Sequence, residues 1–151
     1  MKALVIYTSK HGCTKQSATK LAETLEADLV DASQKTNVSL EAYDTVLIGS
    51  SVYAGQILKP ISEFCSVNLK TLMTKRIVFF VCCGFENKAL EIIDLTFPKE
   101  LTSVALTKGY FGYSFKNLGF FEKMICKMIG APIGETDIRL ENIEKFAQTF
   151  M

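Results

Sequence analysis

The sequence predicts an α/β protein whose core is a doubly wound, five-stranded parallel sheet with helices on both faces. Short apolar runs rich in β-branched and aromatic residues alternate with longer stretches of helical spacing. The central runs, such as 46–48 and 77–81, are almost continuously apolar, which is typical of strands covered on both faces. A chain of 151 residues is expected to form a single domain over 1–151.

Five apolar runs are expected to form the strands. They cover 3–7, 29–30, 45–50, 77–82 and 104–107. Each is short and is followed by turn-forming or small residues, which suits parallel strands joined by helical crossovers.

Five helices are expected between and after these strands. The first, over 14–27, places Ala18, Leu21, Ala22 and Leu25 on one apolar face. The second contains Pro60 in its first turn, where proline is tolerated. The remaining helices are expected over 86–95, ending near Phe97-Pro98, and over 117–129 and 139–150.

Composition excludes several functional classes. A net charge of +1 provides no strong field for nucleic acid or an acidic membrane. Five cysteines, an odd number without a C-x-x-C pair, and His11 as the single histidine indicate reduced thiols in a cytoplasmic protein and no metal site. The apolar run over 3–7 is too short for the core of a signal peptide.

The most informative segment is the polar loop between the first strand and the first helix. The start of a helix presents unpaired backbone N–H groups and the positive end of its dipole, which together favour a phosphate. An alternative interpretation is a polar turn in which Thr14 caps the helix. The candidate phosphate-binding residues are Thr8, Ser9, Lys10, His11, Gly12, Cys13 and Thr14.

Two further loops follow the third and fourth strands. In the first, small residues surround Tyr53, whose ring could stack on an isoalloxazine, although a loop tyrosine also serves plain packing. In the second, Gly84 permits unusual dihedral angles and Phe85 could cover the other face of the ring. The candidate ring contacts are Ser51, Val52, Tyr53, Ala54, Gly55, Cys83, Gly84 and Phe85. Ligands of open α/β sheets bind at the carboxyl ends of the strands, so the three loops predict one site.

The chain resembles flavodoxin-like proteins in these loops. It is most similar to the bacterial menaquinone-dependent protoporphyrinogen oxidase type in three segments, 43–55, 121–125 and the Gly134-Glu135-Thr136-Asp137 stretch leading to Arg139. The resemblance implies strand order 2-1-3-4-5 and FMN as cofactor, with its phosphate on residues 8–14 and its ring on the other two loops. Two stretches, 83–103 and 140–145, are shorter here than in those oxidases.

The resemblance implies an electron-transfer protein or an oxidoreductase that passes electrons from a reduced, protoporphyrinogen-like substrate to a quinone or a redox partner protein. It supplies no catalytic side chain, because the flavin carries the electrons. Ordinary flavodoxins are strongly acidic, and the near-neutral charge of this chain favours the oxidase type. The alternatives are a partner-binding module without flavin and an NAD(P)H-dependent quinone reductase.

Two other clusters have structural alternatives. Glu135, Asp137 and Arg139 could act as acid and base, but the simpler interpretation is that they cap the last helix. The aromatic segment 110–115 could contact a membrane peripherally, a quinone or a protein, and it could equally cover the sheet edge.

Overall fold

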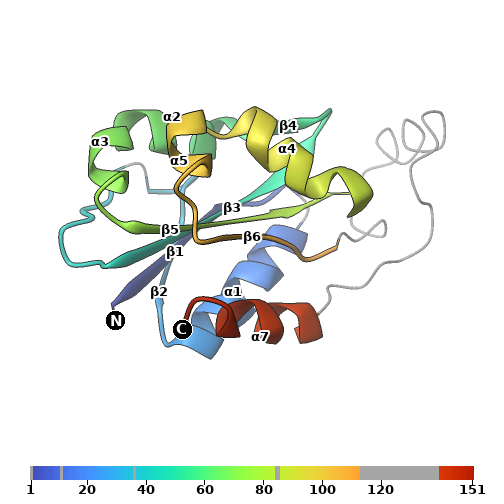
Figure 1. Ribbon diagram of the computed structural model, residues 1–151, viewed down its shortest axis with the longest axis horizontal. Coiled ribbons are helices and arrows are strands. Elements are labelled where there is room, and N and C mark those ends of the chain that lie inside the picture. The colour runs from blue at the N-terminus through green and yellow to red at the C-terminus, as the bar shows by residue number, and fades with distance from the viewer. Residues whose placement is uncertain (1, 11, 36, 84–85, 113–139) are drawn as a thin grey trace.

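The computed structural model describes residues 2–10, 12–35, 37–83, 86–112 and 140–151. Its parallel sheet has the order β2-β1-β3-β5-β6 (Figure 1), which confirms the predicted 2-1-3-4-5 arrangement. The bounds are β1 Ala3–Thr8, β2 Asp28–Asp31, β3 Thr45–Tyr53, β5 Arg76–Cys82 and β6 Thr107–Tyr110. An additional strand, β4 (Gln56–Ile57), pairs antiparallel with the end of β3.

Helices cover both faces of the sheet, as predicted. In Figure 1, α1 (Cys13–Leu25) and α7 (Leu140–Gln148) lie on one face. The opposite face carries α2 (Lys59–Val67), α3 (Leu69–Leu72), the 3₁₀ turn η1 (Glu86–Lys88), α4 (Ala89–Thr96) and α5 (Lys99–Thr102). Pro60 lies in the first turn of α2, where its missing N–H breaks no helical hydrogen bond.

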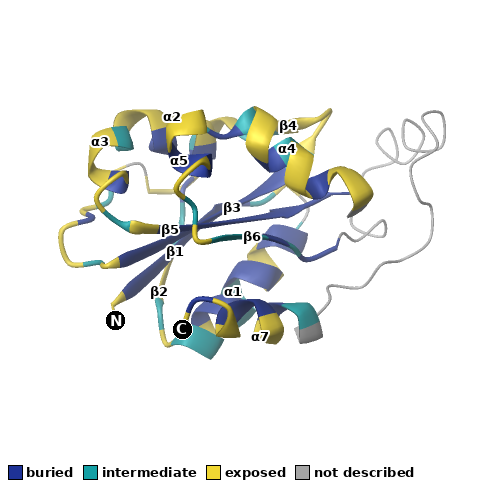
Figure 2. Cartoon of the chain, viewed as in Figure 1, coloured by how far each residue is buried: buried dark blue, intermediate teal, exposed yellow. Residues whose placement is uncertain are grey.

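The hydrophobic core forms two layers, one on each face of the sheet. Leu4 and Ile6 of β1 pack with α2, α3, α4 and α5, whereas Val5 packs with α1 and α7. Because successive side chains of a strand point to opposite faces, a strand with a layer on each side is apolar throughout. Figure 2 shows the resulting buried centre between two exposed outer helical surfaces.

The last strand begins later than the sequence predicts. The predicted run was 104–107, but β6 covers Thr107–Tyr110, and Val104 and Leu106 are exposed. This strand is at the edge of the sheet, so its residues are only partly buried and lack the apolar signal of a central strand. A Cβ at Gly109 would lie 2.7 Å from the ring of Phe146 in α7, so glycine allows the close packing of this helix.

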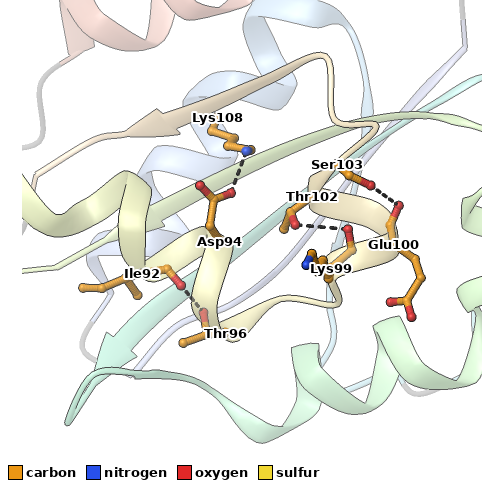
Figure 3. Close-up of polar contacts among 8 residues, drawn as sticks. All are labelled: Ile92, Asp94, Thr96, Lys99, Glu100, Thr102, Ser103 and Lys108. Atoms are coloured by element: carbon orange, nitrogen blue, oxygen red, sulfur yellow. Dashed lines mark hydrogen bonds and ion pairs between the residues drawn. The ribbon is translucent and has the colours of Figure 1, made fainter.

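The segment between β5 and β6 is tied to the sheet edge by polar contacts. Lys108 of β6 donates to Asp94 of α4 across 2.6 Å (Figure 3). Helix α4 ends at Thr96 with Phe97 as its C-cap residue, which agrees with the predicted stop near Phe97-Pro98, and Leu90 within it is exposed. The predicted helix over 117–129 and the Glu135, Asp137 and Arg139 cluster lie outside the described residues.

The aromatic segment after the last predicted strand covers the sheet in the part that the structure describes. Tyr110 belongs to β6, and its hydroxyl donates to the carbonyl oxygen of Cys83 at 2.9 Å. Phe111 is 1% exposed and packs between the rings of Phe80 and Phe146. These two aromatic residues therefore have structural roles. Among the described residues, no helix has the length and apolar character needed to cross a membrane.

Candidate functional site

The loop after β1 leaves the start of α1 without a side-chain cap. Gly12 occupies the N-cap position with a left-handed φ of 92°, and no side chain accepts a capping hydrogen bond there. The first turn of α1 contains no acidic residue. Uncapped N–H groups and the helix dipole make this terminus suitable for an anion. The alternative in which Thr14 caps the helix is wrong, because Thr14 lies inside α1 and is fully buried.

The Ser51 hydroxyl joins this loop to the carboxyl end of β3. It accepts a hydrogen bond from the backbone N–H of Lys10 at 3.2 Å and shares one of 2.7 Å with Thr14 Oγ1. Ser51 is 9% exposed and Thr14 is 0% exposed, so water has little access to the Thr14 contact. One short side chain therefore sets the position of both candidate loops relative to each other.

A second buried hydroxyl in this region lacks a partner. Thr8 ends β1 and is 3% exposed, and its Oγ1 has no hydrogen-bond partner among the described residues. A buried hydroxyl without a partner costs on the order of 1–3 kcal/mol. A phosphate held by the adjacent loop would supply an acceptor for it. Ser9 differs, because its Oγ accepts from the N–H of Gly12 at 2.9 Å.

Tyr53 is displayed by a tight hairpin between β3 and β4. Tyr53 pairs with Gln56, and the two residues between them, Ala54 and Gly55, have φ values of 51° and 75°. Two consecutive left-handed residues are typical of a type I′ turn, in which alanine at the first position is strained. The hairpin holds Tyr53 at the rim of the site with 43% of its surface exposed.

Lys10 contacts the Tyr53 ring. Its Nζ lies 3.2 Å from the ring centroid, well within the range of a cation–π interaction. The two loops are thus joined at their base by Ser51 and at their rim by Lys10 and Tyr53.

The third loop is described only at its start. Cys83 is 4% exposed, and Gly84 and Phe85 lie outside the described residues, as does His11. Cys82, at the end of β5, is also buried. The pKa of its thiol is raised, mainly by a hydrogen bond with Cys13 and secondly by burial. Cys13 additionally contacts the carbonyl oxygen of Gly112 at 3.7 Å. Both thiols are therefore buried packing groups next to the loop after β1.

The structure brings most of the predicted site residues together. Lys10 and Thr14 contact the end of β3 through Ser51 and Tyr53. Ser9 and Gly12 are joined within the loop after β1, and Thr8 pairs with Ser50 in the sheet. Val52, which the sequence placed in a loop after a strand over 45–50, lies in β3 and pairs with Ile57, because pairing with β4 extends the strand to Tyr53. Sequence reasoning missed the supporting contacts of Ser50, whose Oγ accepts from the N–H of Leu58 at 3.0 Å, because β4 is too short for a periodic signal.

Known proteins resemble this chain in sequence and in fold. Residues 4–138 match the family described as Flavodoxin domain. An uncharacterized protein of Methanocaldococcus jannaschii is 32% identical over 111 residues, which are 73% of this chain and 69% of that protein.

Solved structures share the fold at low identity. Oxidised flavodoxin 1 of Bacillus cereus superposes with a TM-score of 0.68 at 15% identity, covering 99% of this chain and 97% of that one. Rubredoxin oxygen:oxidoreductase of Desulfovibrio gigas superposes with a TM-score of 0.65 at 17% identity, and the match covers 98% of this chain but only 34% of that chain. A flavoprotein of Lactobacillus acidophilus, solved in complex with FMN, gives 0.52 at 19% identity over 72% of this chain and 92% of that one.

Proposed function

Because the chain belongs to the Flavodoxin domain family, we propose that it binds FMN at the carboxyl edge of the sheet and transfers electrons through it. The observation that carries the proposal is that the Thr8 hydroxyl, buried without a partner among the described residues, ends β1 at the same edge of the sheet where α1 begins without a side-chain cap. These groups supply a hydrogen-bond donor and a positive dipole to one anionic group. The residues present therefore suit a phosphate.

Different residues would contact different parts of the cofactor. Thr8 and the N–H groups of the first turn of α1 would hold the phosphate, and Ser51 would keep the neighbouring loop in place. Tyr53 would cover one face of the ring, and the Cys83–Phe85 loop would approach from the other side. When bound, FMN supplies reversible acceptance of electrons, and the protein sets its orientation and potential.

The test is Thr8→Val, which replaces the hydroxyl with a methyl group of the same shape. Without cofactor, the variant should be as stable as the original protein or more stable, because an unsatisfied buried hydroxyl is removed. With FMN, it should bind at least tenfold more weakly, since a charge-assisted hydrogen bond is worth about 1.5–3 kcal/mol. FMN affinity is measured by flavin fluorescence, and stability by urea unfolding.

Thr45→Val is the matched control. Thr45 Oγ1 is also buried without a partner among the described residues, but Thr45 begins β3 and pairs with Ala3 and Arg76 at the opposite edge of the sheet. It should gain stability and leave FMN affinity unchanged. Equal FMN affinity in both variants would contradict the phosphate assignment, and failure of the original protein to bind FMN would favour a partner-binding module.

A second candidate is oxidation of a reduced tetrapyrrole-like substrate with a quinone as acceptor. The near-neutral net charge of +1 favours it over a carrier that docks by strong charge complementarity. The experiment is anaerobic reduction of the FMN-loaded protein by protoporphyrinogen, followed by reoxidation with a menaquinone analogue. Reduction by a partner protein or by NAD(P)H, without reaction with protoporphyrinogen, would support the carrier or the quinone reductase instead.

A further inference from the structure

The contact between Lys10 and Tyr53 places a positive charge against an aromatic ring at the rim of the candidate site. The backbone N–H of Lys10 is anchored on Ser51 at 3.2 Å, and its Nζ lies 3.2 Å from the centroid of Tyr53. Lysine attracted to a ring face by its quadrupole is held there more strongly where water is partly excluded. The same loop that would bind phosphate therefore also places a lysine ammonium group against the aromatic ring of Tyr53.

The strand order indicates from which side Lys10 approaches. Lys10 belongs to the loop after β1, Tyr53 ends β3, and Cys83 follows β5. In the sheet, β3 lies between β1 and β5. A lysine that reaches the ring from the loop after β1 occupies one of its two faces, so a ligand can stack only on the other.

We propose that Lys10 is a positioning residue for the flavin, lying behind Tyr53 on the β1 side while the flavin ring stacks on the β5 side. The inference rests on the proposed function. A fixed positive charge behind the stacking ring stabilises the reduced flavin, which carries negative charge, more than the oxidised flavin. Lys10 thereby raises the reduction potential of the bound flavin.

The size of the effect follows from the geometry. Adding a stacking separation of about 3.5 Å to the 3.2 Å between Lys10 Nζ and the Tyr53 centroid puts the charge about 7 Å from the flavin ring. At that distance in fully hydrated surroundings, the affinity ratio of reduced over oxidised flavin changes about threefold, and more where water is excluded. A threefold change corresponds to about 15 mV for a two-electron couple.

The experiment compares Lys10→Met with Lys10→Arg and Lys15→Met. Methionine keeps the length of the side chain without its charge, and arginine keeps a cation able to lie on the ring. Lys15 is an exposed residue in the first turn of α1, so its replacement removes an equal charge from the phosphate region. Affinities of FMN and riboflavin, and the reduction potential of each complex, are measured for all proteins.

The proposal predicts that Lys10→Met lowers the potential by about 15 mV or more, with riboflavin as well as FMN, while Lys10→Arg and Lys15→Met stay near the original value. In a Tyr53→Leu background the effect of Lys10→Met should shrink. Unchanged potential with tighter riboflavin binding would overturn the proposal and place Lys10 on the flavin's own face of Tyr53. Equal shifts in Lys10→Met and Lys15→Met would also overturn it. Absence of flavin binding in the original protein would overturn the proposed function itself.

Discussion

Replacing Ser51 with alanine tests the junction on which the candidate site depends. Two hydrogen bonds are lost, one from the N–H of Lys10 and one with Thr14 Oγ1. Lys10 is exposed, so water can replace the first partner at little cost. Thr14 is 0% exposed, so its hydroxyl is left buried without the Ser51 contact.

The expected loss of stability comes almost entirely from Thr14. Among the described residues, the Thr14 hydroxyl then keeps only the weak acceptor Cys82 Sγ. A buried hydroxyl without a good partner costs about 1–3 kcal/mol, whereas removing both partners of a buried pair is nearly neutral. Ser51→Ala should therefore lower the free energy of unfolding by about 1–3 kcal/mol. Adding Thr14→Val in the same chain should recover most of that loss.

Urea unfolding of the two single variants and the double variant closes a double-mutant cycle. FMN affinity is measured in parallel and should fall in Ser51→Ala, because the two loops are no longer held in register before binding. A Ser51→Ala variant within 0.5 kcal/mol of the original protein, with unchanged FMN affinity, would refute the reasoning. Full additivity of the two single effects would show that the hydroxyl pair is not the source of the cost.

Three other changes should give measurable results. Gly49→Ala places a Cβ against the ring of the buried Phe80, so unfolding in urea should show a loss of about 1–3 kcal/mol, partly recovered by adding Phe80→Leu; a neutral result would contradict the packing. Ala54→Asn should raise the thermal midpoint, gaining roughly 0.5–1 kcal/mol, because asparagine tolerates the left-handed φ of 51° better; a lower midpoint would argue against the type I′ turn. Burial raises the pKa of the Cys65 thiol to about 12 from 9.0. The stability that the buried neutral thiol contributes is therefore complete below pH 9 and falls as pH rises towards 12, so the free energy of unfolding of Cys65→Ala should fall less steeply over that range, by up to about 1.4 kcal/mol per pH unit. Parallel pH profiles of the two proteins would contradict this.

The central strands were predictable because their signal is local. Every residue of β1 is buried, so the continuous apolar run in the sequence directly indicates a strand that is covered on both faces. The edge strand β6 was placed too early for the opposite reason. Its burial is partial, and its Gly109 is explained only by Phe146, which is distant in the chain.

The candidate site divides in the same way. The sequence by itself determined which loops follow the strands and that a helix begins directly after the first of these loops, since both depend on neighbouring residues. Only the tertiary structure decided that Ser51 joins two loops, that Thr8 is left without a partner among the described residues, and that Lys10 contacts Tyr53. Those contacts connect residues about forty positions apart, and no local pattern encodes a hydrogen bond or a ring contact that exists only after the strands have paired.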